Sequence, residues 1–419
     1  MGSFRRISFG LKQAVRPEIE KVFASRLVDH VREHDFRLDL GALQLRLPRR
    51  FGLCHGVERA IQLAHETRLH FPDARLFLTD EIVHNPAVNR RLQQLGYRYL
   101  GGGYADGTTI DALGPDDVVV LPAFGAETPL IDRLRERGVQ LVDTTCGEVM
   151  TVWKRVREYA RDGFTTAIHG APQHQETRAT LSRADHEDPF LPQRLGARGA
   201  WIVVRDIGDA RALARFIAGR DGAETLRERF DGCLSPGFDP ASDLRRVGIA
   251  NQTTMLAGET LKVQEIVRLA FVERYGEQGA ATRLRLADTV CSATQDRQDA
   301  LLALIDEPLD LLLVVGGYNS ANTTHLAELA RTHGVAAFHI EAAQCLHDRR
   351  TLHSWDAAAR REMPLPGWWP AHAPVCIGVA AGASTPDARI GEVLLRLAQL
   401  ADVAVPTLDA EPAGVAAMS

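Results

Sequence analysis

The sequence predicts an α/β fold of three similar lobes, each with a small parallel sheet flanked by helices. Short apolar strands alternate with amphipathic helices from about residue 43 onward, and this alternation is typical of parallel sheets with crossover helices. A strand, a cysteine and a helix follow one another at Cys146 and again at Cys291, and Cys54 also stands directly before a helical pattern. The repeated pattern favours three lobes that each contribute one cysteine to a shared centre, because ligands bind beyond the carboxyl ends of parallel strands.

The elements follow in chain order. Residues 1–42 are expected to form an extension with a helix over residues 17–33. The three lobes are expected at 43–146, 147–288 and 289–405, followed by a C-terminal tail at 406–419. The clearest apolar runs predict strands at residues 75–78, 118–121, 165–168, 201–204, 247–250, 311–315 and 375–380.

Two stretches break the alternation of strands and helices. Residues 181–200 and 346–373 are rich in proline, charge and tryptophan. These residue types interrupt regular elements, so we expect loops or surface insertions there.

Composition narrows the class of protein. The chain has 419 residues, a net charge of −5 and a charged fraction of 25%, which is ordinary for a soluble protein. Its apolar runs are too short to span a bilayer, and residues 1–20 lack the apolar core of a secretory signal. Six scattered cysteines fit a reducing compartment. We therefore expect a cytoplasmic protein without a membrane partner, and the acidic net charge argues against nucleic acid.

Three cysteines are candidate metal ligands because of where they stand. A helix N-terminus offers unpaired N–H groups and partial positive charge, which favour the thiolate that metals bind. Cys54, Cys146 and Cys291 all have this placement in the sequence. Three thiolates fit a [4Fe–4S] cluster with one iron open to substrate, and they also fit a zinc site. Sequence spacing does not separate the two metals.

The other three cysteines have different surroundings. Cys376 lies in "APVCIGVAA", which predicts a buried strand and a structural role. Cys233 lies in a loop-like stretch, and Cys345 has no explanation from its neighbours. The cysteines are too far apart in sequence for CxxC motifs.

Polar residues follow several of the predicted strands. They include His84, the pair His174 and Glu176, Thr253, the run around Ser320 and Asn322, and Ser384. Such residues beside glycines at helix N-termini suit an anion such as phosphate, although simple helix capping explains any single cluster. His174 and Glu176 form a candidate acid–base pair, and in a strand their side chains would face the same way.

Nine stretches resemble the LytB family of 4-hydroxy-3-methylbut-2-enyl diphosphate reductases, and they run in family order across about residues 43–400. They are "GLCHGVERAI", "EIVHNPAVNRRL", "LPAFGAE", "VDTTCGEV", "HGAPQHQET", "GIANQTTM", "DTVCSATQDRQDA", "VVGGYNSANTTHLAELA" and "GVAAGASTPD". The N-terminal extension and the residue sequences "LPAFGAE" and "PGFDP" resemble those of the longer plant and cyanobacterial branch of this family.

The resemblance implies a fold and an activity. Three lobes would surround one [4Fe–4S] cluster per subunit, held by Cys54, Cys146 and Cys291. The substrate, 4-hydroxy-3-methylbut-2-enyl diphosphate, would lose its allylic hydroxyl as water on receiving two electrons and two protons. The products would be isopentenyl and dimethylallyl diphosphate, made in the last step of the non-mevalonate isoprenoid pathway. Ferredoxin or flavodoxin would supply the electrons.

Residue matching to this family also implies individual roles. Glu176 would feed protons to the leaving oxygen, Thr253 would contact the substrate hydroxyl, and His174 would belong to both the catalytic and the binding group. The side chains expected to hold the diphosphate are His84, His174, Ser320, Asn322 and Ser384.

Three residues depart from the usual family pattern. Phe124 stands where many bacterial members have a histidine, and the plant-like branch resembles this chain in having the phenylalanine. Gly147 stands where proline is common. Ala321 replaces a serine and so removes a hydroxyl from the expected diphosphate pocket. A hydrogen bond to a charged group contributes about 1.5–3 kcal/mol, so we expect weaker substrate binding unless water or a backbone N–H compensates.

Two other functions are compatible with the same motifs. A paralogue could keep the cluster and act on another diphosphate, and Ala321 is the residue that motivates this alternative. A non-catalytic metal or redox sensor is the second alternative, and Glu176 argues against it because a sensor needs no carboxylate beside a phosphate pocket.

Overall fold

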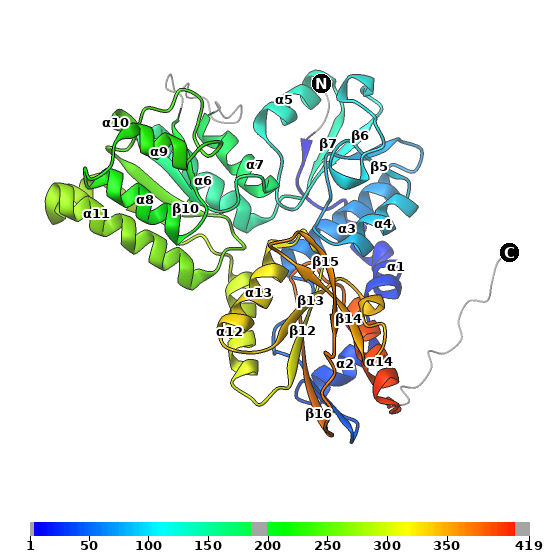
Figure 1. Ribbon diagram of the computed structural model, residues 1–419. Coiled ribbons are helices and arrows are strands. Elements are labelled where there is room, and N and C mark those ends of the chain that lie inside the picture. Colours follow the sequence, from blue (N-terminus) through cyan, green and yellow to red (C-terminus); the bar gives the residue numbers. More distant parts are fainter. Residues whose placement is uncertain (1–3, 186–198, 407–419) are drawn as a thin grey trace. The chain divides into compact units, whose positions relative to one another are not determined.

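The computed structural model describes residues 4–185 and 199–406. It divides into two compact units, each built from helices and parallel sheets (Figure 1). Unit 1 comprises Met1–Val15 and His55–Gln295, and unit 2 comprises Arg16–Cys54 and Asp296–Ser419. The predicted α/β class with small parallel sheets is confirmed. The boundaries of the three predicted lobes stay a prediction.

The first sheet of unit 1 is parallel throughout. Its strands, in spatial order, are β1 (Phe4–Arg5), β7 (Gln140–Asp143), β6 (Val118–Leu121), β4 (Leu76–Leu78) and β5 (Tyr97–Tyr99). The helices of this part are α3 (His55–His70), α4 (Pro86–Gln94) and α5 (Thr128–Glu136), with 3-10 turns η1 (Gly102–Tyr104) and η2 (Ile110–Ala112). Because the strands are parallel, the loops after β4, β6 and β7 leave the same edge of the sheet.

The second sheet of unit 1 is also parallel. Its order is β11 (Leu284–Leu286), β10 (Val247–Asn251), β8 (Thr165–His169) and β9 (Trp201–Val204). Its helices are α6 (Gly147–Arg161), α7 (Gln175–Asp185), α8 (Ile207–Ile217), α9 (Ala223–Arg229), α10 (Pro240–Asp243) and α11 (Ala257–Arg283). Helix α6 packs on β8 and β10, and α8 packs along α11 (Figure 1). Gly276 interrupts α11 with a φ of +70°, a backbone conformation that glycine adopts without strain.

The sheet of unit 2 has one antiparallel edge strand, β2, paired with β3. Its order is β13 (Ala337–Ile340), β12 (Leu311–Val315), β16 (Val375–Ala381), β3 (Leu43–Arg46) and β2 (Arg37–Asp39). The helices are α1 (Lys12–Phe23), α2 (Arg26–Glu33), α12 (Ser292–Ile305), α13 (Ala321–Thr332) and α14 (Asp387–Ala401), with the 3-10 turn η3 (Ala343–Cys345). The loops after β12 and β16 leave the same edge, because the two strands are parallel neighbours.

The N-terminal residues form more elements than expected. The single helix expected over residues 17–33 is instead two helices, α1 and α2. Ser25 separates them, because its side chain accepts the Val28 N–H and so caps the start of α2. The extension expected at residues 1–42 also supplies the edge strands β1 and β2.

The stretch 346–373 contains an antiparallel hairpin of β14 (Thr351–Asp356) and β15 (Arg361–Pro366). The first expectation, a loop, is therefore wrong there, and the second, a surface insertion, stays a prediction. Leu352 is fully buried in the core of unit 2, which explains why this polar stretch is ordered as strands. In the other stretch, residues 181–185 finish α7, whereas 186–198 lie outside the described residues. Nearly all of the tail expected at 406–419 lies outside them too.

Among the helices of residues 4–185 and 199–406, none combines the length and the apolar character needed to cross a bilayer.

Candidate functional site

A buried carboxyl group is the central titratable feature of unit 1. Glu176 lies in the first turn of α7 and is 3% exposed. The backbone N–H of Thr253 donates to Oε1 at 2.7 Å, and the Thr253 hydroxyl donates to Oε2 at 2.9 Å. Burial raises the pKa of Glu176 above its ordinary value, and the bonds from Thr253 and the charge of His84 oppose that rise. Glu176 therefore keeps its proton to a higher pH than an exposed glutamate, as a general acid must.

Thr253 connects this acid to one of the candidate cysteines. The residue follows β10, and its backbone carbonyl accepts the N–H of Cys291 at 3.0 Å. Glu176 lies in the first turn of α7, the helix that follows β8, and β8 is the strand next to β10. Parallel pairing of β8 and β10 therefore explains why residues distant in sequence meet at this edge.

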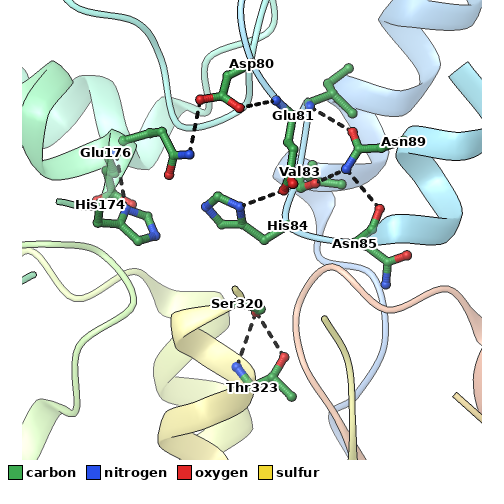
Figure 2. A network of polar contacts seen from close by, with 12 residues as sticks. Asp80, Glu81, Val83, His84, Asn85, Asn89, His174, Glu176, Ser320 and Thr323 are labelled. Atoms are coloured by element: carbon green, nitrogen blue, oxygen red, sulfur yellow. Dashed lines mark hydrogen bonds and ion pairs between the residues drawn. The ribbon is translucent and has the colours of Figure 1, made fainter. Parts of the chain in front are cut away.

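Two histidine rings and one phenylalanine ring lie together in unit 1. His84 stacks on Phe124 with ring centres 4.5 Å apart and an angle of 11°. His174 meets His84 edge-on at 5.0 Å and 78° (Figure 2). Glu81 Oε2 lies 3.2 Å from His84 Nδ1. These contacts fix the orientation of the His84 ring.

The turn that carries His84 is held by two asparagines. Asn85 caps α4 through bonds from the N–H groups of the first turn, and Pro86 occupies the first helical position. Asn89 is fully buried, accepts the Ile82 N–H, and donates to the carbonyls of Val83 and Asn85 (Figure 2). The residues of "VHNPAVN" thus form a helix cap whose hydrogen bonds are made within the turn itself, and this turn fixes the direction of His84.

His174 and Glu176 lie at the start of a helix, not in a strand. Both stand at the N-terminus of α7, and the Glu176 N–H donates to His174 Nδ1 at 3.2 Å (Figure 2). The same-face expectation for a strand therefore does not apply. His174 contributes to the helix start while its ring contacts His84.

Two polar residues of this region were missed by the sequence analysis. Asp80 accepts the Glu81 N–H at 2.7 Å and the Gln175 side-chain amide at 3.1 Å. This pair joins the loop of His84 to the start of α7. Asp80 could have been suspected because it follows an apolar strand in the same stretch as His84, but its pairing with Gln175 spans 95 residues and has no sequence signal.

Cys146 stands at the predicted strand-to-helix junction. It follows β7, occupies the N-cap position of α6 and is partly exposed. Its N–H donates to the Ala123 carbonyl at 2.8 Å. The preceding turn is fixed by buried Asp143, which accepts the N–H and hydroxyl of Thr145 and pairs with Arg6 of the N-terminal segment at 2.6 Å.

Two groups of Thr294 lie close to the sulfur of Cys291. It directly precedes α12 and is partly exposed. The Thr294 N–H donates to Sγ at 3.3 Å, and the Thr294 hydroxyl oxygen lies 3.0 Å from the same sulfur. Donors around a sulfur favour the thiolate over the thiol, which is the form that ligates metals.

Cys54 belongs to unit 2, and Cys146 and Cys291 belong to unit 1. Cys54 is partly exposed, directly precedes α3, and donates its N–H to the Ala383 carbonyl at 3.0 Å. Within the described parts of the chain, no group of three or more His, Cys, Asp or Glu side chains is gathered as a metal site. The chemistry of the cysteines fits an iron–sulfur cluster, because each is partly exposed and adjoins a helix N-terminus.

The remaining cysteines are not equivalent to these three. Cys233 is 2% exposed within the core around β9, and burial raises the pKa of its thiol. Cys345 is also buried. The buried strand predicted there is confirmed as β16, but Cys376 itself is only partly buried, so the expected burial of its side chain is wrong. Val375 and Ile377 face the core, and Cys376 alternates to the other side, where Arg46 Nε donates to its sulfur.

The expected diphosphate residues of unit 2 surround the start of α13. Ser320 is the N-cap of this helix and accepts the Thr323 N–H at 3.4 Å and the Thr323 hydroxyl at 2.9 Å. Asn322 Oδ1 accepts the Ala383 N–H at 2.9 Å, which fixes the loop that carries Ser384. All three expected residues are nearly buried. Capping is therefore real for Ser320, and it coexists with a helix N-terminus suited to an anion.

Thr323 was also missed by the sequence analysis. A side chain at Gly316 or at Gly382 would overlap its hydroxyl. Glycines at these two positions let the loops after β12 and β16 approach the helix start closely. Gly316, in the stretch "VVGGYNSAN", was the available signal in the sequence.

The fold and these side chains define an α/β enzyme with a buried acid, two histidines in contact, cysteines at helix starts and a helix start suited to an anion. The chain belongs to the LytB family: the family model described as LytB protein matches residues 45–398.

The relatives described here are named for the same activity. A protein of Synechococcus sp. (strain CC9311), named 4-hydroxy-3-methylbut-2-enyl diphosphate reductase, is 38% identical over 404 residues, covering 95% of this chain and 96% of that protein. A protein of the same name from Thermosynechococcus vestitus is 39% identical over 409 residues, covering 96% of each. These relatives are cyanobacterial, as the resemblance predicted. The structure of the E-1-hydroxy-2-methyl-but-2-enyl-4-diphosphate reductase from Plasmodium falciparum has a similar fold, with a TM-score of 0.60, 18% identity and coverage of 84% and 87%.

Proposed function

We propose that this chain reduces 4-hydroxy-3-methylbut-2-enyl diphosphate to isopentenyl and dimethylallyl diphosphate, the last step of the non-mevalonate isoprenoid pathway. Two electrons and two protons remove the allylic hydroxyl as water. The observation that carries the proposal is the buried Glu176, held by Thr253 next to Cys291, in a chain 38–39% identical to proteins named for this activity. The test is anaerobic incubation with the diphosphate and a one-electron reductant, followed by product analysis. Absence of both five-carbon products would contradict the proposal.

The proposed cofactor is one [4Fe–4S] cluster per subunit, with Cys54, Cys146 and Cys291 as its three protein ligands. Support comes from their partial exposure and helix-terminal positions. When bound, such a cluster supplies single-electron reduction and Lewis acidity. Ferredoxin or flavodoxin is the proposed electron donor, and the cytoplasmic location stays a prediction.

The proposed proton donor is Glu176. Burial keeps its carboxyl group protonated to a higher pH than usual, so it can pass a proton to the leaving oxygen. Thr253 holds both carboxyl oxygens and is proposed to contact the substrate hydroxyl. His174 is proposed to serve both proton transfer and binding, because it adjoins Glu176 and contacts His84.

The diphosphate is proposed to bind the side chains His84, His174, Ser320, Asn322 and Ser384. Support in unit 2 comes from the hydroxyl and amide groups at the start of α13, where backbone N–H groups and partial positive charge favour an anion. In unit 1, the fixed orientation of the His84 ring on Phe124 reduces the conformational entropy lost on binding.

Replacing Thr253 by Val should move the alkaline limb of the kcat/KM profile to higher pH. The hydroxyl of Thr253 stabilises the Glu176 carboxylate and lowers its pKa, so removing it lets burial raise the pKa further. Thr253→Ser keeps the hydroxyl and is the matched control. The measurement is kcat/KM against pH, and an alkaline limb that moves to lower pH in the Val variant would contradict the role of Glu176.

Ala321→Ser should lower the KM for the diphosphate. Ala321 begins α13 between Ser320 and Asn322, and a serine restores the hydroxyl usual in the family. One hydrogen bond to a charged group contributes about 1.5–3 kcal/mol, so a decrease of roughly tenfold or more is expected. A KM that stays unchanged would remove the reason to consider a paralogue acting on another diphosphate.

A further inference from the structure

The β14–β15 hairpin contacts the segment 316–320 of unit 2 through one cross-strand pair. Trp355 and Glu362 are directly opposite each other in the hairpin, so their side chains share a face. The Trp355 ring stacks on Tyr318 at 4.7 Å and 10°. The Tyr318 hydroxyl donates to Glu362 Oε1 at 2.6 Å. Both hairpin residues therefore contact the same tyrosine.

Tyr318 is also bound on its inner side. Its hydroxyl accepts the Glu341 N–H at 3.3 Å and lies 3.4 Å from the sulfur of buried Cys345. Its ring meets that of His339 edge-on at 5.3 Å. Burial raises the pKa of Tyr318 well above its usual range, so the hydroxyl stays a donor to Glu362.

His339 continues these contacts to the start of the loop. It is 1% exposed, and burial lowers its pKa to about 4, so the ring is neutral near pH 7. Its Nε2 lies 3.0 Å from the Gly316 carbonyl oxygen, so this nitrogen carries the proton and donates it. Ser354 of the hairpin donates to the His339 carbonyl at 3.2 Å. The hairpin thus fixes the segment 316–320 at its beginning and at Tyr318.

We propose that the β14–β15 hairpin positions the segment 316–320 through Tyr318 and thereby sets the affinity of Ser320 and Asn322 for a diphosphate. This inference rests on the proposed function, since it assumes that these two residues bind the diphosphate. Tyr318, Trp355 and Glu362 are positioning residues, because they act through the loop. Tyr318 stands two residues before the Ser320 cap, so a small shift of its ring displaces the cap and the helix start together.

The test compares Tyr318→Phe, Trp355→Leu and Glu362→Ala with the wild-type holoenzyme. Anaerobic titration calorimetry with inorganic pyrophosphate gives the binding constant, and steady-state kinetics with the allylic diphosphate gives KM and kcat separately. Loss of one anchoring hydrogen bond should raise the pyrophosphate Kd and the KM about three- to tenfold. The kcat should stay within about twofold, because the acid in unit 1 is unchanged. Tyr275→Phe and Glu392→Ala, on α11 and α14, are the matched controls and should change neither constant.

Each outcome bears on a separate claim. A rise in Kd and KM with nearly constant kcat supports the inference, and Trp355→Phe, which keeps an aromatic face, should recover most of the affinity. Unchanged Kd and KM in folded Tyr318→Phe and Glu362→Ala proteins would overturn it and leave the proposed function standing. Wild-type protein that forms no five-carbon product would overturn the proposed function and this inference with it. If Trp355→Leu does not fold, the other two variants still show whether the hairpin affects diphosphate binding.

Discussion

Glu176→Gln should lower kcat by roughly 10²–10⁴-fold, the usual contribution of a positioned proton donor. The amide is close to isosteric and can still accept from the Thr253 N–H, but it has no proton to give to the leaving oxygen. The fold should be retained, because the neutral amide resembles the protonated acid that burial favours. Steady-state kinetics and thermal unfolding together make the measurement. Glu265→Gln, on the exposed side of α11, is the matched control.

The same variant should change how stability depends on pH. Burial raises the pKa of folded Glu176 above the unfolded value of about 4.3. The folded chain then binds a proton that the unfolded chain releases, so this contribution is complete below the unfolded pKa and is lost as pH rises through the folded pKa. Glu176→Gln should remove that decline and leave the protein at least as stable near pH 7. A wild-type kcat in the Glu176→Gln variant would refute the proposed role of Glu176 in proton transfer.

Replacing Cys146 or Cys291 by Ser should abolish activity and remove most of the bound iron and sulfide. A serine hydroxyl is a far poorer ligand than a thiolate, and a three-ligand cluster has no spare protein donor. The measurement is iron and acid-labile sulfide per chain after anaerobic purification, with circular dichroism to confirm folding.

Cys376→Ser is the control for these two variants. Cys376 is a partly exposed cysteine whose sulfur accepts from Arg46, so its replacement should preserve cluster content. Cys233 is a poor control, because a serine in its apolar core would cost stability for reasons unrelated to metal. Full iron content in Cys146→Ser and Cys291→Ser would contradict the ligand assignment.

Buried central strands could be predicted from the sequence because both their faces are covered. β6 and β12 are continuous apolar runs with a neighbouring strand on each side, and the structure has them at the predicted residues. The short edge strands β1 and β5 have two and three residues, too few for any periodic signal. Helix α1 could not be separated from α2 without recognising Ser25 as a cap.

The hairpin was missed for a different reason. Residues 361–366 of β15 alternate between exposed and half-exposed positions and include two prolines, which resembles a loop in composition. Its order comes from tertiary contacts, chiefly buried Leu352 and the stacking of Trp355 on Tyr318. Tertiary packing of this kind overrides local propensity and leaves no local pattern.

The candidate site was easier to predict than its supporting contacts. Cys146 and Cys291 could be placed at strand-to-helix junctions because strand alternation, cap residues and helical spacing lie within a few residues of each other. The pairing of Glu176 with Thr253 spans 77 residues and follows only from the parallel neighbours β8 and β10. Residues that act through such long-range contacts, including Asp80 and Thr323, need the fold before they can be identified.

The most direct test is Mössbauer spectroscopy of anaerobically purified protein, with iron and sulfide analysis, before and after addition of 4-hydroxy-3-methylbut-2-enyl diphosphate and a one-electron reductant. The account predicts about four irons and four sulfides per chain, one iron site distinct from the rest, and conversion to five-carbon diphosphates. Zinc in place of iron, or an intact cluster that never yields those products, would contradict it.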